Sequence, residues 1–287
     1  MRLADKSVLI TGATGSIGKE TAKLFKKNWA KLALLGRDKK KLGELQAELG
    51  VDKSIIYLEY EARDESSVAS AINKTNEKFG SLDAVVANAG NEGVIQSLTD
   101  YTVEDFSYTL EVNVTGVWLL MKHATPIMTG QKKGSFIAIS SGAGVVGSSG
   151  QCPYAASKHA VCGMIKTACI EFGSSGVRFN VLAPGPIANR MMESLHKQIN
   201  PANPTEVEDF VKSKIPMNRY GTNGEIAQFA LFLASVESTF CNGGVFLADG
   251  GLTAGWLANS LEKKFRIDWD RGRAMKETLH KRNNQKS

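Results

Sequence analysis

The sequence is poor in the residues that build metal sites and disulfide frameworks. Its four cysteines, Cys152, Cys162, Cys169 and Cys241, form neither a Cys-x-x-Cys pair nor the spacing of metal ligands. We therefore expect no metal site, and reduced thiols of the kind found in cytoplasmic proteins. No repeats are present, and no apolar run approaches the roughly eighteen residues that cross a bilayer. The first residues show no signal peptide, so we expect a cytoplasmic protein that binds no membrane.

The net charge is also small over most of the chain, although the formal total is +6. The segment from Leu252 to Ser287 has nine lysines and arginines against four acidic residues, a net charge of +5. The remainder is close to neutral, which argues against a nucleic-acid interface on the body of the protein. We interpret residues 256–287 as a basic, mainly solvated C-terminal extension. Binding to an acidic partner or to a neighbouring subunit is the alternative.

Apolar strand-like segments alternate with amphipathic helical segments over residues 1–255. The predicted strands lie near 7–11, 31–36, 54–60, 82–87, 134–140, 177–182 and 244–248. The predicted helices lie near 16–28, 38–49, 64–79, 102–129, 153–173 and 223–235. This alternation predicts a single α/β domain, a doubly wound parallel sheet with helices on both faces. Right-handed crossovers would place a ligand crevice at the carboxyl edge of the strands.

The segment 188–216 interrupts this alternation. It contains Pro201, Pro204 and Pro216 among mixed polar and apolar residues. Long insertions in compact domains are usually functional, so we expect a lid over a substrate site. Met191 and Met192 would be either adaptable lining of that site or one apolar face of a short helix.

A glycine-rich turn follows the first predicted strand. Residues 11–18 read Thr-Gly-Ala-Thr-Gly-Ser-Ile-Gly and pass into a helical pattern. In this context Gly12 permits a tight turn, and Gly18 permits close packing of helix and strand. Free N–H groups at the helix start would then face the pyrophosphate of a dinucleotide. An ordinary glycine-rich turn is the alternative.

Tyr154 and Lys158 are four residues apart on a predicted helix, and Ser141 precedes Tyr154 by thirteen residues. Residues at this helical spacing share one face, so the ammonium of Lys158 can lie beside the phenol of Tyr154. A fixed cation lowers the pKa of a phenol from its ordinary value of about 10. We therefore interpret Tyr154 as a general acid/base for alcohol–carbonyl chemistry. A pair on a solvated helix face is the alternative.

Further signatures occur in the order and spacing of a known family. They are the glycine turn, Asn88-Ala-Gly90, Asn113, Ser141, Tyr154, Lys158, Pro184-Gly185 and Asp249-Gly-Gly251. By these residues, the chain up to residue 255 resembles a short-chain dehydrogenase/reductase. The turn departs from the family pattern Gly-x-x-x-Gly-x-Gly, because Ser16 stands where a glycine is usual. That spacing is closer to the extended branch, which includes sugar-nucleotide epimerases, but Asn113 and Ser141 favour the shorter type.

The resemblance implies a Rossmann-type sheet with strand order 3-2-1-4-5-6-7. It also implies catalytic roles for Asn113, Ser141, Tyr154 and Lys158. Tyr154 would donate a proton to the developing alkoxide, and the Ser141 hydroxyl would hydrogen-bond to the same oxygen. Lys158 would keep the pKa of Tyr154 low and hold the nicotinamide ribose. Asn113 would lie in a weakened helical segment whose free backbone carbonyl holds a water of a proton relay; a side chain satisfied at a helix kink is the alternative.

The resemblance further implies a dinucleotide site. The expected residues are Gly12, Thr14, Gly15, Ser16, Ile17, Gly18, Arg37, Glu61, Ala62, Asn88, Ala89, Gly90, Tyr154, Lys158, Pro184, Gly185 and Ile187. Gly36 stands where NAD-preferring relatives carry an aspartate, and the guanidinium of Arg37 suits a 2′-phosphate. We therefore expect NADP(H), with NAD, for which Asp38 argues, as the alternative. Glu61 replaces the shorter aspartate that contacts adenine in relatives.

Together these features predict an NADP(H)-dependent oxidoreductase that interconverts a ketone and a secondary alcohol. Asn91-Glu92-Gly93 and residues 196–204 are similar to relatives acting on cyclic ketones, so we expect a small cyclic carbonyl substrate. A 3-oxoacyl thioester reductase, a non-catalytic dinucleotide-sensing or scaffold protein, and an epimerase are the alternatives. The family also implies a homo-oligomer, a tetramer or dimer, formed through the helices that carry Asn113 and Tyr154.

Overall fold

The computed structural model describes residues 1–254, so the predicted extension 256–287 lies outside the described residues. Seven parallel strands form one sheet in the order β3-β2-β1-β4-β5-β6-β7. The strands are β1 (Ser7–Thr11), β2 (Lys31–Gly36), β3 (Ile55–Glu59), β4 (Ala84–Ala87), β5 (Gly134–Ile139), β6 (Val177–Pro184) and β7 (Val245–Ala248). The predicted doubly wound class and strand order are confirmed. Pro184, expected just after a strand, is the last residue of β6.

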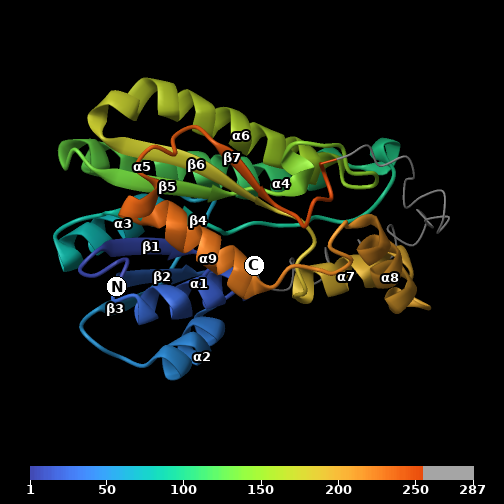
Figure 1. The fold of residues 1–287 in the computed structure, drawn as a ribbon, viewed down its shortest axis with the longest axis horizontal. Coiled ribbons are helices and arrows are strands. Elements are labelled where there is room, and N and C mark those ends of the chain that lie inside the picture. The colour runs from blue at the N-terminus through green and yellow to red at the C-terminus, as the bar shows by residue number, and fades with distance from the viewer. Residues whose placement is uncertain (255–287) are drawn as a thin grey trace.

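Helices cover both faces of the sheet (Figure 1). On one face lie α1 (Ser16–Lys27), α2 (Lys39–Leu49) and α9 (Asn223–Ala234); on the other lie α3 (Glu65–Phe79), α5 (Gly116–Gly130) and α6 (Cys152–Phe172). Side chains of the central strands point alternately to the two faces: Val8 and Ile10 pack with α1 and α9, whereas Leu9 packs with α3 and α5. Because both faces are covered, the strands are mainly apolar, as the sequence indicated.

The helix expected at 102–129 is present with an irregular centre. It consists of α4 (Val103–Leu110), a π-helical turn (Glu111–Thr115) and α5. This part of the chain has a low propensity for a regular helix, because it contains the β-branched residues Val112, Val114 and Thr115 followed by Gly116. Single π-turns inside helices often occur at functional sites. Short 3-10 turns lie at Leu98–Asp100, Gly142–Gly144, Gly173–Ser175 and Val236–Ser238.

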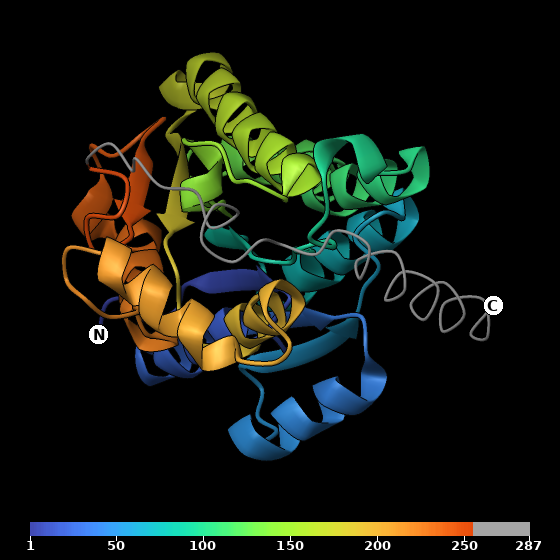
Figure 2. The same ribbon diagram turned by 90° about the vertical axis from the view of Figure 1, so that its right-hand side faces the viewer.

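The segment expected to form a lid contains two helices, α7 (Arg190–Ile199) and α8 (Pro204–Lys214). Asn189 and Asn203 cap their N-termini, and Pro204 occupies the first turn of α8, where a missing N–H costs nothing. Both helices lie beyond the carboxyl ends of the strands (Figure 1), and Figure 2 looks onto that end of the molecule. The fold thus places 188–216 over the edge where a ligand crevice is expected.

Among residues 1–254, no helix combines the length and hydrophobicity that crossing a bilayer requires. In the same range, no cluster of three or more His, Cys, Asp or Glu side chains has an arrangement that would hold a metal ion. The four cysteines are free thiols.

Candidate active site

Ser141 and Tyr154 meet at the carboxyl edge of the sheet. Ser141 follows β5 and begins the 3-10 turn η3 (Gly142–Gly144), whereas Tyr154 lies in the first turn of α6. A hydrogen bond joins the Ser141 hydroxyl to the phenol, which is partly buried. Two hydroxyl groups from different elements are therefore in contact, as binding of one carbonyl oxygen by both would require.

Lys158 lies one helical turn after Tyr154 and is almost fully buried. Its ammonium nitrogen is 5.5 Å from the centroid of the Tyr154 ring and donates a hydrogen bond of 3.0 Å to the carbonyl of Ile139. Burial lowers the pKa of Lys158 to about 8. The side chain thus still carries a proton at neutral pH, next to the ring of Tyr154.

The pKa of Tyr154 departs from the expectation. Burial raises this pKa above its ordinary value, the hydrogen bond with Ser141 lowers it, and the charge of Glu92 raises it further. The net shift is upward, so the prediction that the pKa of Tyr154 is kept low is wrong for this structure, and burial is the main reason. The ammonium of Lys158 lies over the ring and donates to the Ile139 carbonyl.

Asn113 lies in the π-helical turn and is buried. Its amide binds the backbone of Asn91 twice, accepting from the N–H at 2.8 Å and donating to the carbonyl at 2.9 Å. It also donates to the Ser157 hydroxyl at 3.0 Å. The side chain is thus satisfied at an irregular point of the helix, and it ties α6 to the loop after β4. The water relay through its backbone stays a prediction.

The glycine turn packs against the end of β4. Gly12 has a positive φ of 61°, and a Cβ at this position would lie 2.9 Å from the Cα of Ala89. A Cβ on Gly18 would lie 2.3 Å from the carbonyl oxygen of Gly12, so the expected close approach of α1 to the turn is present. The amide of Asn88 donates to the carbonyls of Thr11 and Gly12, both at 3.1 Å. Asn88 therefore supports the turn.

The N-terminus of α1 has the properties of an anion site. Gly15 is its N-cap residue and provides no capping side chain, and the first turn contains no acidic residue. The N–H groups of this turn and the positive end of the helix dipole are therefore left for an anion. Thr14, Ser16 and Ile17 flank the same position. These residues fit the pyrophosphate of a dinucleotide.

Pro184, Gly185 and Ile187 lie on the other side of the crevice, after β6. A Cβ on Gly185 would lie 2.6 Å from the Cα of Asp249, so no larger residue fits there. Ile187 pairs with Gly221, but the bonds of this bridge are made by its neighbours Pro186 and Ala188. Within residues 1–254, the N–H and carbonyl of Ile187 itself form no backbone hydrogen bond outside the regular elements. They remain suited to the carboxamide contact that the sequence predicted.

The adenosine end is formed by the ends of β2 and β3. A Cβ on Gly36 would lie 3.1 Å from both the methyl group of Thr14 and a methyl group of Leu42, so an aspartate would be crowded here. Asp38 accepts hydrogen bonds from the backbone of Lys40 and Lys41, and thereby caps α2. This weakens the argument for NAD that rested on Asp38.

The acidic side chain of Glu61, near this crevice, binds an arginine. Glu61 accepts from Arg63, through its backbone N–H at 3.2 Å and its guanidinium at 3.4 Å. Ala62, expected beside it, is buried against Gly116 at the start of α5. The longer carboxylate at residue 61 therefore turns back onto its own loop, which the sequence alone did not indicate.

The lid contacts the loop after β4. Arg190, at the start of α7, forms an ion pair of 3.5 Å with Glu92, and the side chain of Gln198 accepts a hydrogen bond of 3.0 Å from the N–H of Ile95. The Glu92 side chain is only 14% exposed, and its charge acts on Tyr154. Glu92 belongs to the segment Asn91-Glu92-Gly93, which the sequence related to the substrate, but no role for its charge was predicted.

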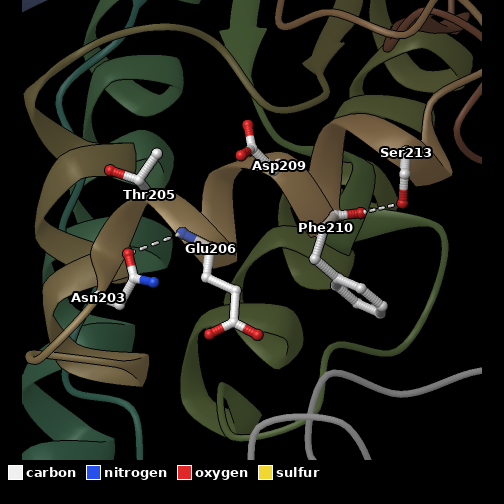
Figure 3. A pocket seen from close by; sticks show the side chains of 6 residues that line it. All are labelled: Asn203, Thr205, Glu206, Asp209, Phe210 and Ser213. Atoms are coloured by element: carbon white, nitrogen blue, oxygen red, sulfur yellow. Dashed lines mark hydrogen bonds between the residues drawn. The ribbon is translucent and has the colours of Figure 1, made fainter.

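A hollow on the outer lid helix lies apart from these residues. Figure 3 shows its lining, which comes from α8 and its N-cap: Asn203, Thr205, Glu206, Asp209, Phe210 and Ser213. None of the predicted site residues contributes to it. Its carboxylates Glu206 and Asp209 would repel an anionic dinucleotide. The candidate active site is therefore the group around Ser141 and Tyr154.

Known proteins are similar to this chain over most of its length. A family model described as enoyl-(acyl carrier protein) reductase matches residues 12–253. Levodione reductase from Leifsonia aquatica is 33% identical over 259 residues, which is 89% of this chain and 97% of that protein. The 3-oxoacyl-[acyl-carrier-protein] reductase FabG from Thermotoga maritima is 35% identical over 255 residues, 88% of this chain and 99% of that protein.

Solved structures agree with the sequence comparison. The crystal structure of levodione reductase matches with a TM-score of 0.86 at 32% identity, covering 89% of this chain and all of that one. ElxO with NADP bound matches with a TM-score of 0.80 at 33% identity, with the same coverage. The protein is thus a member of the short-chain dehydrogenase/reductase family, an NAD(P)-dependent oxidoreductase that acts on CH–OH and C=O groups.

Proposed function

We propose that the protein is an NADP(H)-dependent enzyme that interconverts a small cyclic ketone and its secondary alcohol. The observation that carries this proposal is the contact between the hydroxyls of Ser141 and Tyr154, with the Lys158 ammonium 5.5 Å from the Tyr154 ring. When bound, the nicotinamide supplies or accepts the hydride. The fold then needs only to hold the substrate oxygen and move one proton.

The proton chemistry falls to Tyr154. Because burial and Glu92 raise its pKa, the phenol is protonated at neutral pH and can donate to the oxygen of a ketone. The Ser141 hydroxyl donates a second hydrogen bond to that oxygen and fixes its position. The ammonium of Lys158 stabilises the phenolate that remains, since an opposite charge nearby favours the ionised form.

Several features support NADP(H) and a small substrate. Gly36 carries no carboxylate that would repel a 2′-phosphate, a Cβ there would be crowded by Thr14 and Leu42, and Arg37 follows it. The similar structure of ElxO contains NADP. Levodione reductase, by its name, reduces a dione, and α7 contacts the loop after β4 that carries Glu92. A 3-oxoacyl thioester reductase is the second candidate, supported by the match to FabG.

We also infer a homo-oligomer formed through α5 and α6. Trp118 on α5 is 47% exposed and Ile170 on α6 is 85% exposed, so both helices present a large apolar side chain that an interface would cover. A cytoplasmic location agrees with the four free thiols.

The test is removal of one hydroxyl. In Tyr154→Phe, the rate of NADPH oxidation with a panel of cyclic ketones should fall by roughly 10²–10⁴-fold, because the proton donor is lost. Binding of NADPH, followed by its fluorescence, should persist. Tyr57→Phe is the matched control, since the Tyr57 hydroxyl only binds the carbonyl of Gly50. A rate near that of the wild type in Tyr154→Phe would end the assignment.

The same assay separates the alternatives. Wild-type protein that binds NADPH but oxidises it with no carbonyl compound would be a sensing or scaffold protein. Preferred turnover of a 3-oxoacyl thioester over cyclic ketones would favour the second candidate.

A further inference from the structure

Tyr108, on α4, lies between two guanidinium groups at the adenosine end of the crevice. The terminal nitrogen of Arg37 donates a hydrogen bond of 3.3 Å to the Tyr108 hydroxyl. The guanidinium carbon of Arg63 lies 4.9 Å from the centroid of the same ring. The three side chains come from the end of β2, the loop after β3 and α4, so only the fold brings them together.

The two arginines differ in charge balance. Arg63 pairs with Glu61 at 3.4 Å and with Glu111 at 3.3 Å. Arg37 has no carboxylate within ion-pair distance among residues 1–254, and its described hydrogen bond is the one to the neutral Tyr108 hydroxyl. The cluster therefore carries an uncompensated positive charge at the carboxyl end of β2, on Arg37.

The phenol leaves this charge available for a ligand. A guanidinium has five N–H donors in one plane, and Tyr108 accepts from one of them. The remaining donors include a full edge, which matches two oxygens of a phosphate. An exposed arginine otherwise samples many rotamers, and the hydrogen bond to Tyr108 restricts this freedom before a ligand arrives. Arg63, held by two carboxylates, in turn holds the ring.

We propose that Tyr108 is a specificity-determining positioning residue: its hydroxyl holds the Arg37 guanidinium where it binds the 2′-phosphate of NADP(H). This inference rests on the proposed use of NADP(H). Its contribution is confined to ligands that carry the 2′-phosphate, because the hydroxyl acts through Arg37. Neither Tyr108 nor Arg63 was among the predicted cofactor residues.

The test compares two small probes, 2′,5′-ADP and 5′-ADP, on the full chain by titration calorimetry. Tyr108→Phe keeps the ring and its contact with Arg63, and removes the hydroxyl. We expect the dissociation constant for 2′,5′-ADP to rise by roughly 2–12-fold, the size of one ordinary lost hydrogen bond. The constant for 5′-ADP should not change. Tyr57→Phe, a hydroxyl removed outside the crevice, should leave both constants unchanged.

A double-mutant cycle with Arg37→Ala decides whether the hydroxyl acts through Arg37. In the Arg37→Ala background, Tyr108→Phe should have little further effect on 2′,5′-ADP. Additive effects, or equal weakening of both probes by Tyr108→Phe, would overturn the inference. If Arg37→Ala itself leaves the preference for 2′,5′-ADP intact, the proposed NADP(H) site is wrong as well. Loss of preference in Arg37→Ala but not in Tyr108→Phe would remove only the role of Tyr108.

Discussion

Glu92 is the residue whose charge bears most directly on the proposed proton transfer. It is mostly buried, pairs with Arg190 of the lid at 3.5 Å, and raises the pKa of Tyr154. A negative charge near the phenol favours the protonated form, which is the form that reduces a ketone. It also disfavours anionic substrates close to the reacting oxygen. Glu92 therefore adjusts the acid/base group without touching it through a hydrogen bond.

Replacing this charge should move the pH profile. In Glu92→Gln the pKa of Tyr154 falls, because a group that raised it is gone. The decline of ketone reduction at high pH should therefore begin at a lower pH than in the wild type, and alcohol oxidation should rise at a lower pH. Steady-state rates over a pH series at saturating NADPH measure this. Glu77→Gln, an exposed position on α3, is the control; identical profiles in Glu92→Gln and the wild type would contradict the prediction.

For single residues, the sequence predicted contacts between site residues that are close along the chain. Helical spacing indicated that Tyr154 and Lys158 share a face, and the family resemblance indicated that Ser141 acts beside Tyr154. The sequence did not indicate the contact of Arg37 with Tyr108, which are 71 residues apart. Nor did spacing predict the pKa of Tyr154, because burial and Glu92 act through space.

Among the secondary-structure elements, the lid helices α7 and α8 enclose a buried histidine. His196 on α7 is buried, and its ring nitrogen lies 2.9 Å from the hydroxyl of Tyr220. Burial lowers the pKa of His196, and the charge of Lys212 lowers it further. The charges of Glu208 and Glu193 raise this pKa, but the net shift is downward. A neutral imidazole therefore belongs to the packed lid.

The lid should consequently loosen in acid. Since the pKa of His196 is lower in the folded protein than its ordinary value of 6.5, the unfolded state binds the proton more readily. The contribution to stability is complete above about pH 6.5 and is lost as the pH falls below that value. Hydrogen exchange of peptides from 190–214, compared at neutral and mildly acidic pH, measures it.

Substitution of His196 tests whether this residue causes the acid sensitivity of the lid. His196→Gln should destabilise the protein by about 1–3 kcal/mol at neutral pH, since a buried ring and a hydrogen bond are lost, but its lid exchange should depend less on pH. His159→Gln, an exposed histidine on α6, should behave like the wild type. Equal acid sensitivity in His196→Gln and the wild type would contradict a role for His196.

The sequence predicted the boundaries of elements where the local residue types have strong conformational preferences. The irregular centre of the helix at 102–129 was expected from β-branched residues and a glycine, and a π-helical turn lies there. The lid was expected only as a break in the alternation. A short helix carrying Met191 and Met192 was one interpretation, and α7 contains both residues. The second helix, α8, was missed because prolines masked the pattern, although Asn203 is an ordinary N-cap residue.

In the whole molecule, stability and chemistry are concentrated at opposite edges of the sheet. The proposed site uses the carboxyl ends of the strands, whereas Asp83 joins their amino ends. Its carboxylate accepts from the N–H of Ser7 at 3.1 Å and the Ser81 hydroxyl at 2.9 Å, and pairs with Lys6 and Lys133 at 3.3 and 3.1 Å. Burial would raise the pKa of Asp83, but these bonds hold it below its ordinary value.

Asp83→Asn should therefore reduce stability and spare catalysis. We expect a loss of about 1–3 kcal/mol in the free energy of unfolding, because buried hydrogen bonds to a charged group are weakened, with kcat unchanged. The pKa of Asp83 is lower in the folded state, so its contribution is present above about pH 4 and is lost as the pH falls further. Denaturant melts over a pH series check this; an equal gap between variant and wild type at low and neutral pH would contradict it.

The position of β1 in the middle of the sheet affects how a growing chain can fold. One side of β1 pairs with β2 soon after both are synthesised, but the other side pairs with β4, where Val8 meets Ala84. Until β4 leaves the ribosome, an apolar strand edge stays unpaired and open to other chains. The glycine turn is translated first, yet its supporting residue Asn88 follows much later. Nucleotide capture should therefore be a late event in biosynthesis.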